Sequence, residues 1–175
     1  FSNHYYAIPE TQNFFMMFYR TDIFEEMNLQ PPNTWDDLYA VSDTLQRKNM
    51  KVGLPYTSLD AYSVVSQGMG TQSVFPALLL QNGGNYYSED QTKTELDSPI
   101  ALNAFRQWTN FYKQYGFSLY KDDFSLFRTG EEPLCIQYYT FYNELYTAAP
   151  EIRGMWKMTL IPGTKKEDGS VDRPS

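Results

Sequence analysis

Residues that could perform acid–base or nucleophilic chemistry are scarce in this sequence. His4 is the only histidine and Cys135 is the only cysteine. A Ser-His-Asp triad, a Cys-His pair and a multi-histidine or cysteine-based metal site are therefore excluded. The sequence has no Walker lysine motif, and the glycines within 68–70 do not complete a dinucleotide fingerprint. We expect His4 to lie at the surface and Cys135 to be a small, inert residue of a core strand.

Three pairs of adjacent carboxylates are the remaining candidates for catalysis. Glycoside hydrolases use two carboxylates that flank the scissile bond, but residues adjacent in sequence do not face each other on a helix. We expect these pairs to be solvated surface residues, and we predict no catalytic residue, no metal and no cofactor. A carbohydrate-active enzyme is therefore the weakest alternative. The pairs are Glu25-Glu26, Asp122-Asp123 and Glu131-Glu132.

Aromatic side chains are the unusual feature of the composition. Fifteen Tyr, twelve Phe and three Trp bring the aromatic share to 17%. A tyrosine ring offers a flat apolar face and a hydrogen-bonding hydroxyl, which suits amphipathic ligands such as sugars. The competing interpretation is that most of these rings fill the core. Both uses of the rings can coexist in one domain.

The charge of the chain excludes one class of partner. There are 21 acidic and 14 basic residues, which gives a net charge of −7. That field repels a phosphate backbone, so nucleic acid is not an expected partner. The longest apolar run, residues 14–19, is far shorter than the roughly 20 residues needed to span a bilayer. Composition does not decide the compartment.

The elements that must position any site follow from hydrophobic periodicity and turn residues. Strands that alternate with helices indicate one layered α/β domain with a small mixed sheet and flanking helices. The patterns predict strands at 5–19, 51–56, 134–137 and 156–161, and helices at 21–28, 34–49, 62–69, 74–81, 99–115, 123–127 and 140–148.

Several helix ends carry recognisable capping residues. Thr34 with Asp37 three residues on forms a variant capping box, and Ser98 stands before a proline at the first helical position. Gly116 is placed to end that second helix in the left-handed conformation. We also expect Thr21 to cap the short helix that follows it.

Short blocks along nearly the whole chain resemble the family 1 extracellular solute-binding proteins of ABC importers, the maltose-binding-protein-like family. The blocks occur in the family's order and with its spacing, although Arg20-Thr21 stands where Asn-Lys is usual. They are Tyr6-Ala7-Ile8-Pro9, Phe18 to Phe24, Pro32 to Leu38, Gln81-Asn82-Gly83-Gly84, Leu96-Asp97-Ser98-Pro99, Phe127-Arg128-Thr129-Gly130, Ala149 to Gly154 and Leu160-Ile161-Pro162-Gly163.

The resemblance implies a periplasmic-binding-protein-like class II lobe. Residues 1–175 would be a single lobe, the second of a two-lobed protein, with hinge-proximal segments at 1–13 and 163–175. Phe1 is not an initiator residue and no signal peptide precedes it, so we expect a fragment, with the first lobe and a lipidated signal outside it. The family further implies an extracytoplasmic location, ABC permease subunits as partners, and contact with the membrane only through a lipid anchor.

The resemblance also implies where a ligand would bind. Family members contribute cleft residues from the crossing strand, from the loop after the second strand and from the aromatic loop after the "Phe-x-x-Gly" block. Matched positions in this sequence are Gln12, Asn13, Phe14, Tyr56, Ser58, Asp60, Tyr62, Tyr138, Tyr139 and Tyr142. Amides, carboxylates and tyrosines suit a sugar or oligosaccharide. A receptor for a peptide or polyamine on the same fold stays open, because acidic charge and Asp60 could serve a cationic ligand.

Overall fold

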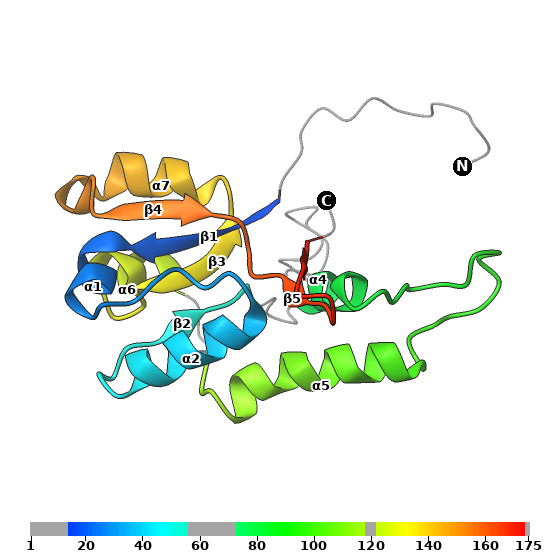
Figure 1. The fold of residues 1–175 in the computed structure, drawn as a ribbon. Helices are drawn as coiled ribbons and strands as arrows, with labels where there is room; N and C mark the ends of the chain where they lie inside the picture. Colours follow the sequence, from blue (N-terminus) through cyan, green and yellow to red (C-terminus); the bar gives the residue numbers. More distant parts are fainter. Residues whose placement is uncertain (1–13, 56–72, 118–121, 174–175) are drawn as a thin grey trace.

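The computed structural model describes residues 14–55, 73–117 and 122–173, in which strands and helices alternate (Figure 1). Within these ranges no helix is long and apolar enough to cross a membrane. The elements are β1 (Phe15–Arg20), α1 (Thr21–Glu26), α2 (Trp35–Gln46), β2 (Val52–Gly53), α4 (Phe75–Gln81), α5 (Pro99–Lys113), α6 (Asp123–Thr129), β3 (Leu134–Tyr138), α7 (Phe141–Ala148), the 3₁₀ turn η1 (Pro150–Ile152), β4 (Trp156–Thr159), β5 (Thr164–Lys165) and β6 (Val171–Asp172).

A four-stranded mixed sheet forms the middle of the domain, with the strand order β2-β3-β1-β4. The first strand, β1, runs antiparallel to both of its neighbours, β3 and β4. The short strand β2 pairs in parallel with β3. The fold class expected from the sequence, an α/β lobe with a small mixed sheet and flanking helices, is confirmed.

Alternation along β1 sends its side chains into two separate cores. Met17 belongs to the larger core, which α2, α4 and α5 cover, whereas the adjacent Phe18 belongs to a smaller core under α6 and α7. Figure 1 shows α7 on one side of the sheet and α2 with α5 on the other. Both side chains are fully buried, so the two-residue period of the strand accounts for the layered arrangement.

Local sequence signals account for most helix ends. Thr34 and Asp37 form the reciprocal capping box of α2, and the Ser98 side chain caps α5. Gly116 and Gly130 have φ angles of 58° and 85°, so both occupy the left-handed region that favours glycine. Asp168 and Gly169 lie in the hairpin turn between β5 and β6.

One capping expectation was wrong. Thr21 does not cap α1, because the helix begins at Thr21 itself and Arg20 occupies the N-cap position without a side-chain capping bond. The β-strand continues up to Arg20, so the chain passes from strand to helix with no residue between them.

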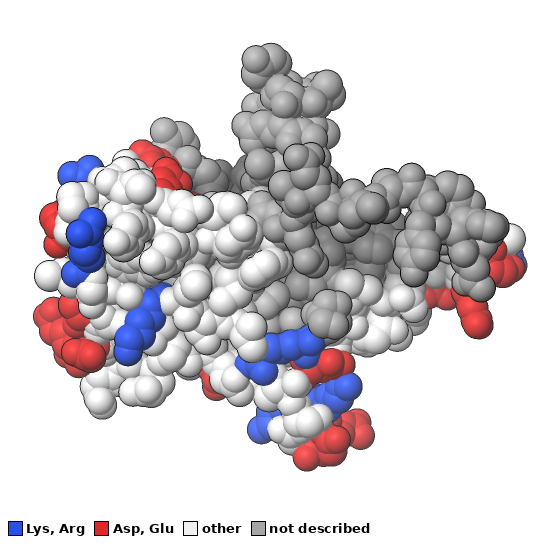
Figure 2. Space-filling view, turned by 90° about the horizontal axis from the view of Figure 1, so that it is seen from above, with Lys and Arg blue, Asp and Glu red and all other residues white. Residues whose placement is uncertain are grey.

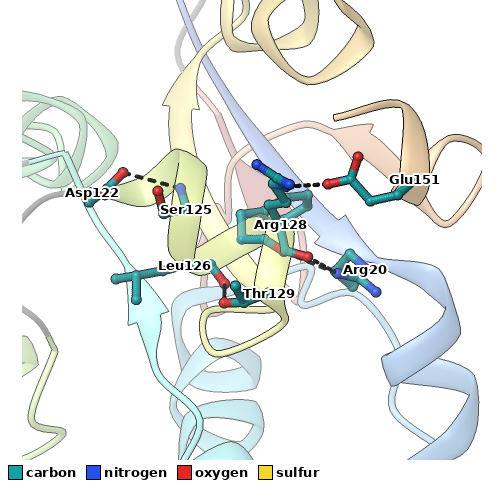
Figure 3. Close-up of polar contacts among 8 residues, drawn as sticks. Arg20, Asp122, Ser125, Leu126, Arg128, Thr129 and Glu151 are labelled. Atoms are coloured by element: carbon teal, nitrogen blue, oxygen red, sulfur yellow. Dashed lines mark hydrogen bonds and ion pairs between the residues drawn. The ribbon is translucent and has the colours of Figure 1, made fainter. Parts of the chain in front are cut away.

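The Arg20 side chain instead caps the far end of another helix. Its guanidinium donates hydrogen bonds to the backbone oxygens of Phe127 (3.1 Å) and Arg128 (3.0 Å) in the last turn of α6, a contact drawn in Figure 3. It also forms an ion pair of 2.6 Å with Asp22. Burial tends to raise the pKa of Asp22, but the hydrogen bond and charge of Arg20 outweigh burial and lower it. The Arg20 side chain therefore links β1 to α6, because a cation satisfies the carbonyls at a helix C-terminus that have no hydrogen-bond partner within the helix.

Removing the Arg20 guanidinium should destabilise the domain. In an Arg20→Met variant the apolar stem is kept, while two carbonyls of α6 and the Asp22 carboxylate lose their buried partner. We expect the free energy of unfolding, measured by urea titration, to fall by about 2 kcal/mol.

The exposed ion pair of Arg128 with Glu151, also drawn in Figure 3, supplies the control. Glu151→Gln breaks that pair at the surface, where ion pairs contribute little. The urea midpoint of this variant should barely change. Equal destabilisation by the two variants would show that Arg20 does not act through burial and capping.

Candidate ligand-binding site

The starts and ends of three strands meet at one edge of the sheet. Phe15, the first residue of β1, lies opposite Tyr138, the last residue of β3. Because β2 is parallel to β3, its carboxyl end points to the same edge, and the chain leaves it through Leu54 and Pro55. Crevices outside the carboxyl ends of strands are the usual ligand sites of open α/β sheets. The three loops that the resemblance singled out therefore start from one edge.

Two stacked aromatic pairs stand at this edge. Phe15 and Tyr138 stack with ring centroids 4.7 Å apart, and Phe14 and Tyr139 stack at 4.8 Å with planes only 13° apart. The Tyr139 N–H donates to the Phe14 oxygen at 2.9 Å, which extends the strand ladder by one residue. Phe14 is 50% exposed and Tyr139 is 37% exposed. The second pair thus presents flat apolar surface to the outside.

A polar hollow of about 320 Å³ opens beside Tyr138. Gln137 lines it and is held from both ends of its amide: the nitrogen donates to the Asp123 carboxylate, and the oxygen accepts the Tyr138 N–H at 3.1 Å. Burial raises the pKa of Tyr138, so its hydroxyl stays a hydrogen-bond donor over a wide pH range. The hollow is lined by Asp122, Asp123, Phe124, Gln137, Tyr138, Thr140, Phe141 and Glu144.

The carboxylates of this hollow come from two helices. Asp122 and Asp123 lie at the N-terminus of α6, where Asp122 accepts the Ser125 N–H at 3.1 Å (Figure 3), and Glu144 lies on α7. Burial, and then the charges of Asp122 and Asp123, raise the pKa of Glu144. The hollow is therefore acidic as well as aromatic.

Two carboxylates that we expected at the surface are buried. Asp123 is 6% exposed and receives the Gln137 amide. Glu132 is completely buried and its carboxylate lies over the Cα atom of Gly53 in β2. Their sequence neighbours Asp122 and Glu131 are exposed, as expected. Adjacent side chains point in different directions, so one member of each of these two pairs turns inward, whereas Glu25 and Glu26 are both exposed as expected.

Tyr142 lies apart from the other aromatic residues of its loop. It stacks on Tyr146 with centroids 5.8 Å apart and meets Trp156 edge-on at 5.5 Å. These rings line a second hollow of about 350 Å³ with Arg153 and Met158. Figure 2 looks down on the side of the molecule where α7 lies, and its charged side chains gather at the margins of a broad uncharged area.

Six of the residues implied by the resemblance lie outside the described residues. The structure places Phe14, Tyr138 and Tyr139 at one edge and Tyr142 apart from them, and the ligand role of every member stays a prediction. Within the described ranges, no cluster of His, Cys, Asp and Glu could hold a metal ion. The six residues are Gln12, Asn13, Tyr56, Ser58, Asp60 and Tyr62.

Comparison with known proteins identifies the family. Residues 1–134 match the family model described as bacterial extracellular solute-binding protein. The chain belongs to this family. No protein of curated function matches it in sequence. Solved structures share the fold of this solute-binding chain at low sequence identity.

Three solved structures illustrate the likeness. A solute-binding protein of an ABC transporter from Thermotoga lettingae, bound to α-D-tagatose, has a TM-score of 0.67 at 21% identity over 86% of this chain. The cyclic α-maltosyl-1,6-maltose binding protein from Arthrobacter globiformis has a TM-score of 0.66 at 21% identity over 91%. The sugar-binding protein MalE from Xanthomonas citri has a TM-score of 0.67 at 17% identity over 86%. This chain spans only 39%, 39% and 38% of those proteins, respectively.

The site edge leaves no room for a side chain at Gly53. A Cβ atom there would overlap the Glu132 carboxylate and lie 2.9 Å from the Cβ atom of Cys135. Gly53→Ala should therefore lower the free energy of unfolding by about 1–3 kcal/mol, because overpacking forces β2 away from β3. Thermal unfolding measures the effect.

Truncating Glu132 separates the overlap with its carboxylate from the close contact with Cys135. In the double variant Gly53→Ala with Glu132→Ala, the overlap with the carboxylate disappears. Partial recovery of the melting temperature, relative to the sum of the single changes, is expected. Strict additivity would argue against the overlap.

Proposed function

We propose that this chain is the ligand-holding second lobe of an extracytoplasmic receptor that delivers a sugar or oligosaccharide to an ABC importer. In the proposal, the ligand lies between the strand edge with its aromatic pairs and a first lobe. Binding stabilises the arrangement in which both lobes enclose it. The chain binds and releases the solute and catalyses no reaction.

The observation that carries the proposal is the exposed Phe14–Tyr139 stack beside a hollow rich in hydrogen-bonding groups. Sugars combine apolar C–H faces with hydroxyl groups that donate and accept hydrogen bonds. A flat aromatic surface next to carboxylate, amide and hydroxyl groups matches both features. A peptide site would need an open strand edge or an apolar groove instead.

Related structures support a saccharide or polyol as the ligand. The proteins compared above bind tagatose and a cyclic maltosyl-maltose, and a further solute-binding protein, from Agrobacterium vitis, holds D-mannitol. These ligands share dense hydroxyl groups and carry no charge. The same family supports an extracytoplasmic location and permease subunits as partners, with any lipid anchor outside residues 1–175.

The lobe assignment has the same support. The compared proteins are more than twice as long as this chain, yet align with most of it. We propose that residues 1–175 form the second lobe, with hinge-proximal segments at 1–13 and 163–175. One lobe then supplies part of the contact that the whole receptor makes.

Truncating the exposed aromatic pair should weaken ligand binding without unfolding the receptor. Tyr139→Ala in the full-length receptor is expected to raise the Kd about tenfold, since a lost aromatic contact costs about 1.4 kcal/mol. Calorimetric titration would use the saccharide that gives the largest thermal shift in a panel containing maltotriose, tagatose and mannitol.

Tyr142→Ala is the matched control, a tyrosine in the first turn of α7 three residues after Tyr139. Tyr142 packs in the second hollow on Tyr146 and Trp156. We therefore expect this variant to have a lower melting temperature but a nearly unchanged Kd for the saccharide. A large affinity loss in Tyr142→Ala together with an unchanged affinity in Tyr139→Ala would contradict the placement of the ligand at the strand edge.

The chain by itself should bind sugars weakly. If a complete receptor binds near 1 μM, about −8.2 kcal/mol, half of that free energy leaves a Kd on the order of 1 mM. Titration of residues 1–175 with the panel tests this expectation. Sub-micromolar binding would overturn the assignment of a single lobe.

A further inference from the structure

We propose that the acidic hollow beside Tyr138 makes the receptor bind neutral or amino-bearing saccharides and reject acidic ones. Glu144 is a specificity-determining residue of this hollow. The proposal rests on the sugar-receptor function. Uronic acids, sialic acids and phosphorylated or sulfated sugars are the rejected class.

The hollow offers hydrogen-bond acceptors rather than cations. Three carboxylates line it, and no Lys or Arg of the described residues does. The Gln137 amide is held in place, since its nitrogen donates one hydrogen bond to Asp123 and its oxygen accepts the Tyr138 N–H. Glu144 is an exposed residue of α7, so its carboxylate is accessible to a ligand. The polar groups that line the hollow are thus mainly carboxylates.

Such a site favours donors on the ligand. A sugar hydroxyl or ammonium group gives a charge-assisted hydrogen bond to a carboxylate, whereas a ligand carboxylate or phosphate adds a like charge to the three already there. An acidic ligand is therefore repelled by the carboxylates of the hollow, whereas a neutral or cationic ligand is not. The aromatic lining of Phe124 and Tyr138 is compatible with the C–H face of either kind of sugar.

Placing these three carboxylates close together costs free energy in the protein without ligand. Glu144 on α7 faces Asp122 and Asp123 on α6, and burial together with these two charges raises its pKa. A raised pKa in the folded chain means that the protonated form is favoured. Stability is therefore greatest below the ordinary glutamate pKa and falls as the pH rises through the folded value. A neutral isostere at this position removes the penalty.

The first experiment measures this cost in the chain itself. Glu144→Gln should raise the melting temperature at pH 7 by about 1–2 °C, and the gain should vanish at pH 4, where Glu144 takes up its proton. Glu89→Gln makes the same change of charge at an exposed loop position outside this hollow and should have little effect. Equal behaviour of the two variants would overturn the proposal.

The second experiment measures selectivity in the full-length receptor. Thermal shifts are compared for maltotriose, the glucosamine trimer and trigalacturonate, which are neutral, cationic and anionic at pH 7. Trigalacturonate should give no thermal shift with the wild type. If it binds to Glu144→Gln, its Kd for this variant should be at least tenfold lower than its Kd for the wild type. A larger shift with trigalacturonate than with both other probes refutes the selectivity.

The two proposals can fail separately. If none of the three probes binds to the wild type or to Glu144→Gln, the sugar-receptor function fails and the charge selectivity fails with it. If neutral sugars bind but trigalacturonate binds as well as they do, the receptor function stands and the selectivity fails.

Discussion

The position of β1 between β3 and β4 is the constraint on which the rest of the domain depends. Both edges of this strand are hydrogen-bonded, so its backbone is satisfied inside the sheet. Its side chains alternate between a core under α2, α4 and α5 and a core under α6 and α7. These helices therefore pack against one or the other face of the sheet.

The same pairing builds the candidate site. With Met17 opposite Ile136 in the middle of the ladder, Phe15 must lie opposite Tyr138 at its end, and Phe14 meets Tyr139 one residue further. A shift of the register by one residue would send the apolar residues of β1 to the wrong faces. Burial in the two cores therefore fixes the register, and the register fixes the aromatic pairs. The site inherits its geometry from the packing behind it.

Helix α6 shows how one element serves stability at one end and the site at the other. Its C-terminus is held by Gly130 in a left-handed conformation and by the buried Arg20. Its N-terminus carries Asp122 and Asp123 into the acidic hollow, close to Glu144.

Sequence alone predicted most of the described elements and the class of fold, whereas the helix expected at 62–69 lies outside the described residues. The apolar run at 14–19, the capping box of Thr34 with Asp37 and the proline and glycine signals around 99–116 act through near neighbours, so each can be read locally. The aromatic loop after β3 was likewise visible in the sequence, although Tyr142 leaves the group because helical geometry turns it toward Tyr146.

Tertiary structure decided which residues meet. No local signal brings Asp123 to Gln137 or Glu144 to Asp122, since these pairs depend on how α6 and α7 pack on one face of the sheet. The inward turn of Glu132 over Gly53 and the reach of Arg20 to α6 arise in the same way. Periodicity specifies which face of an element is apolar, but the partner of that face, and the charges it brings together, follow only from the assembled sheet and its helices.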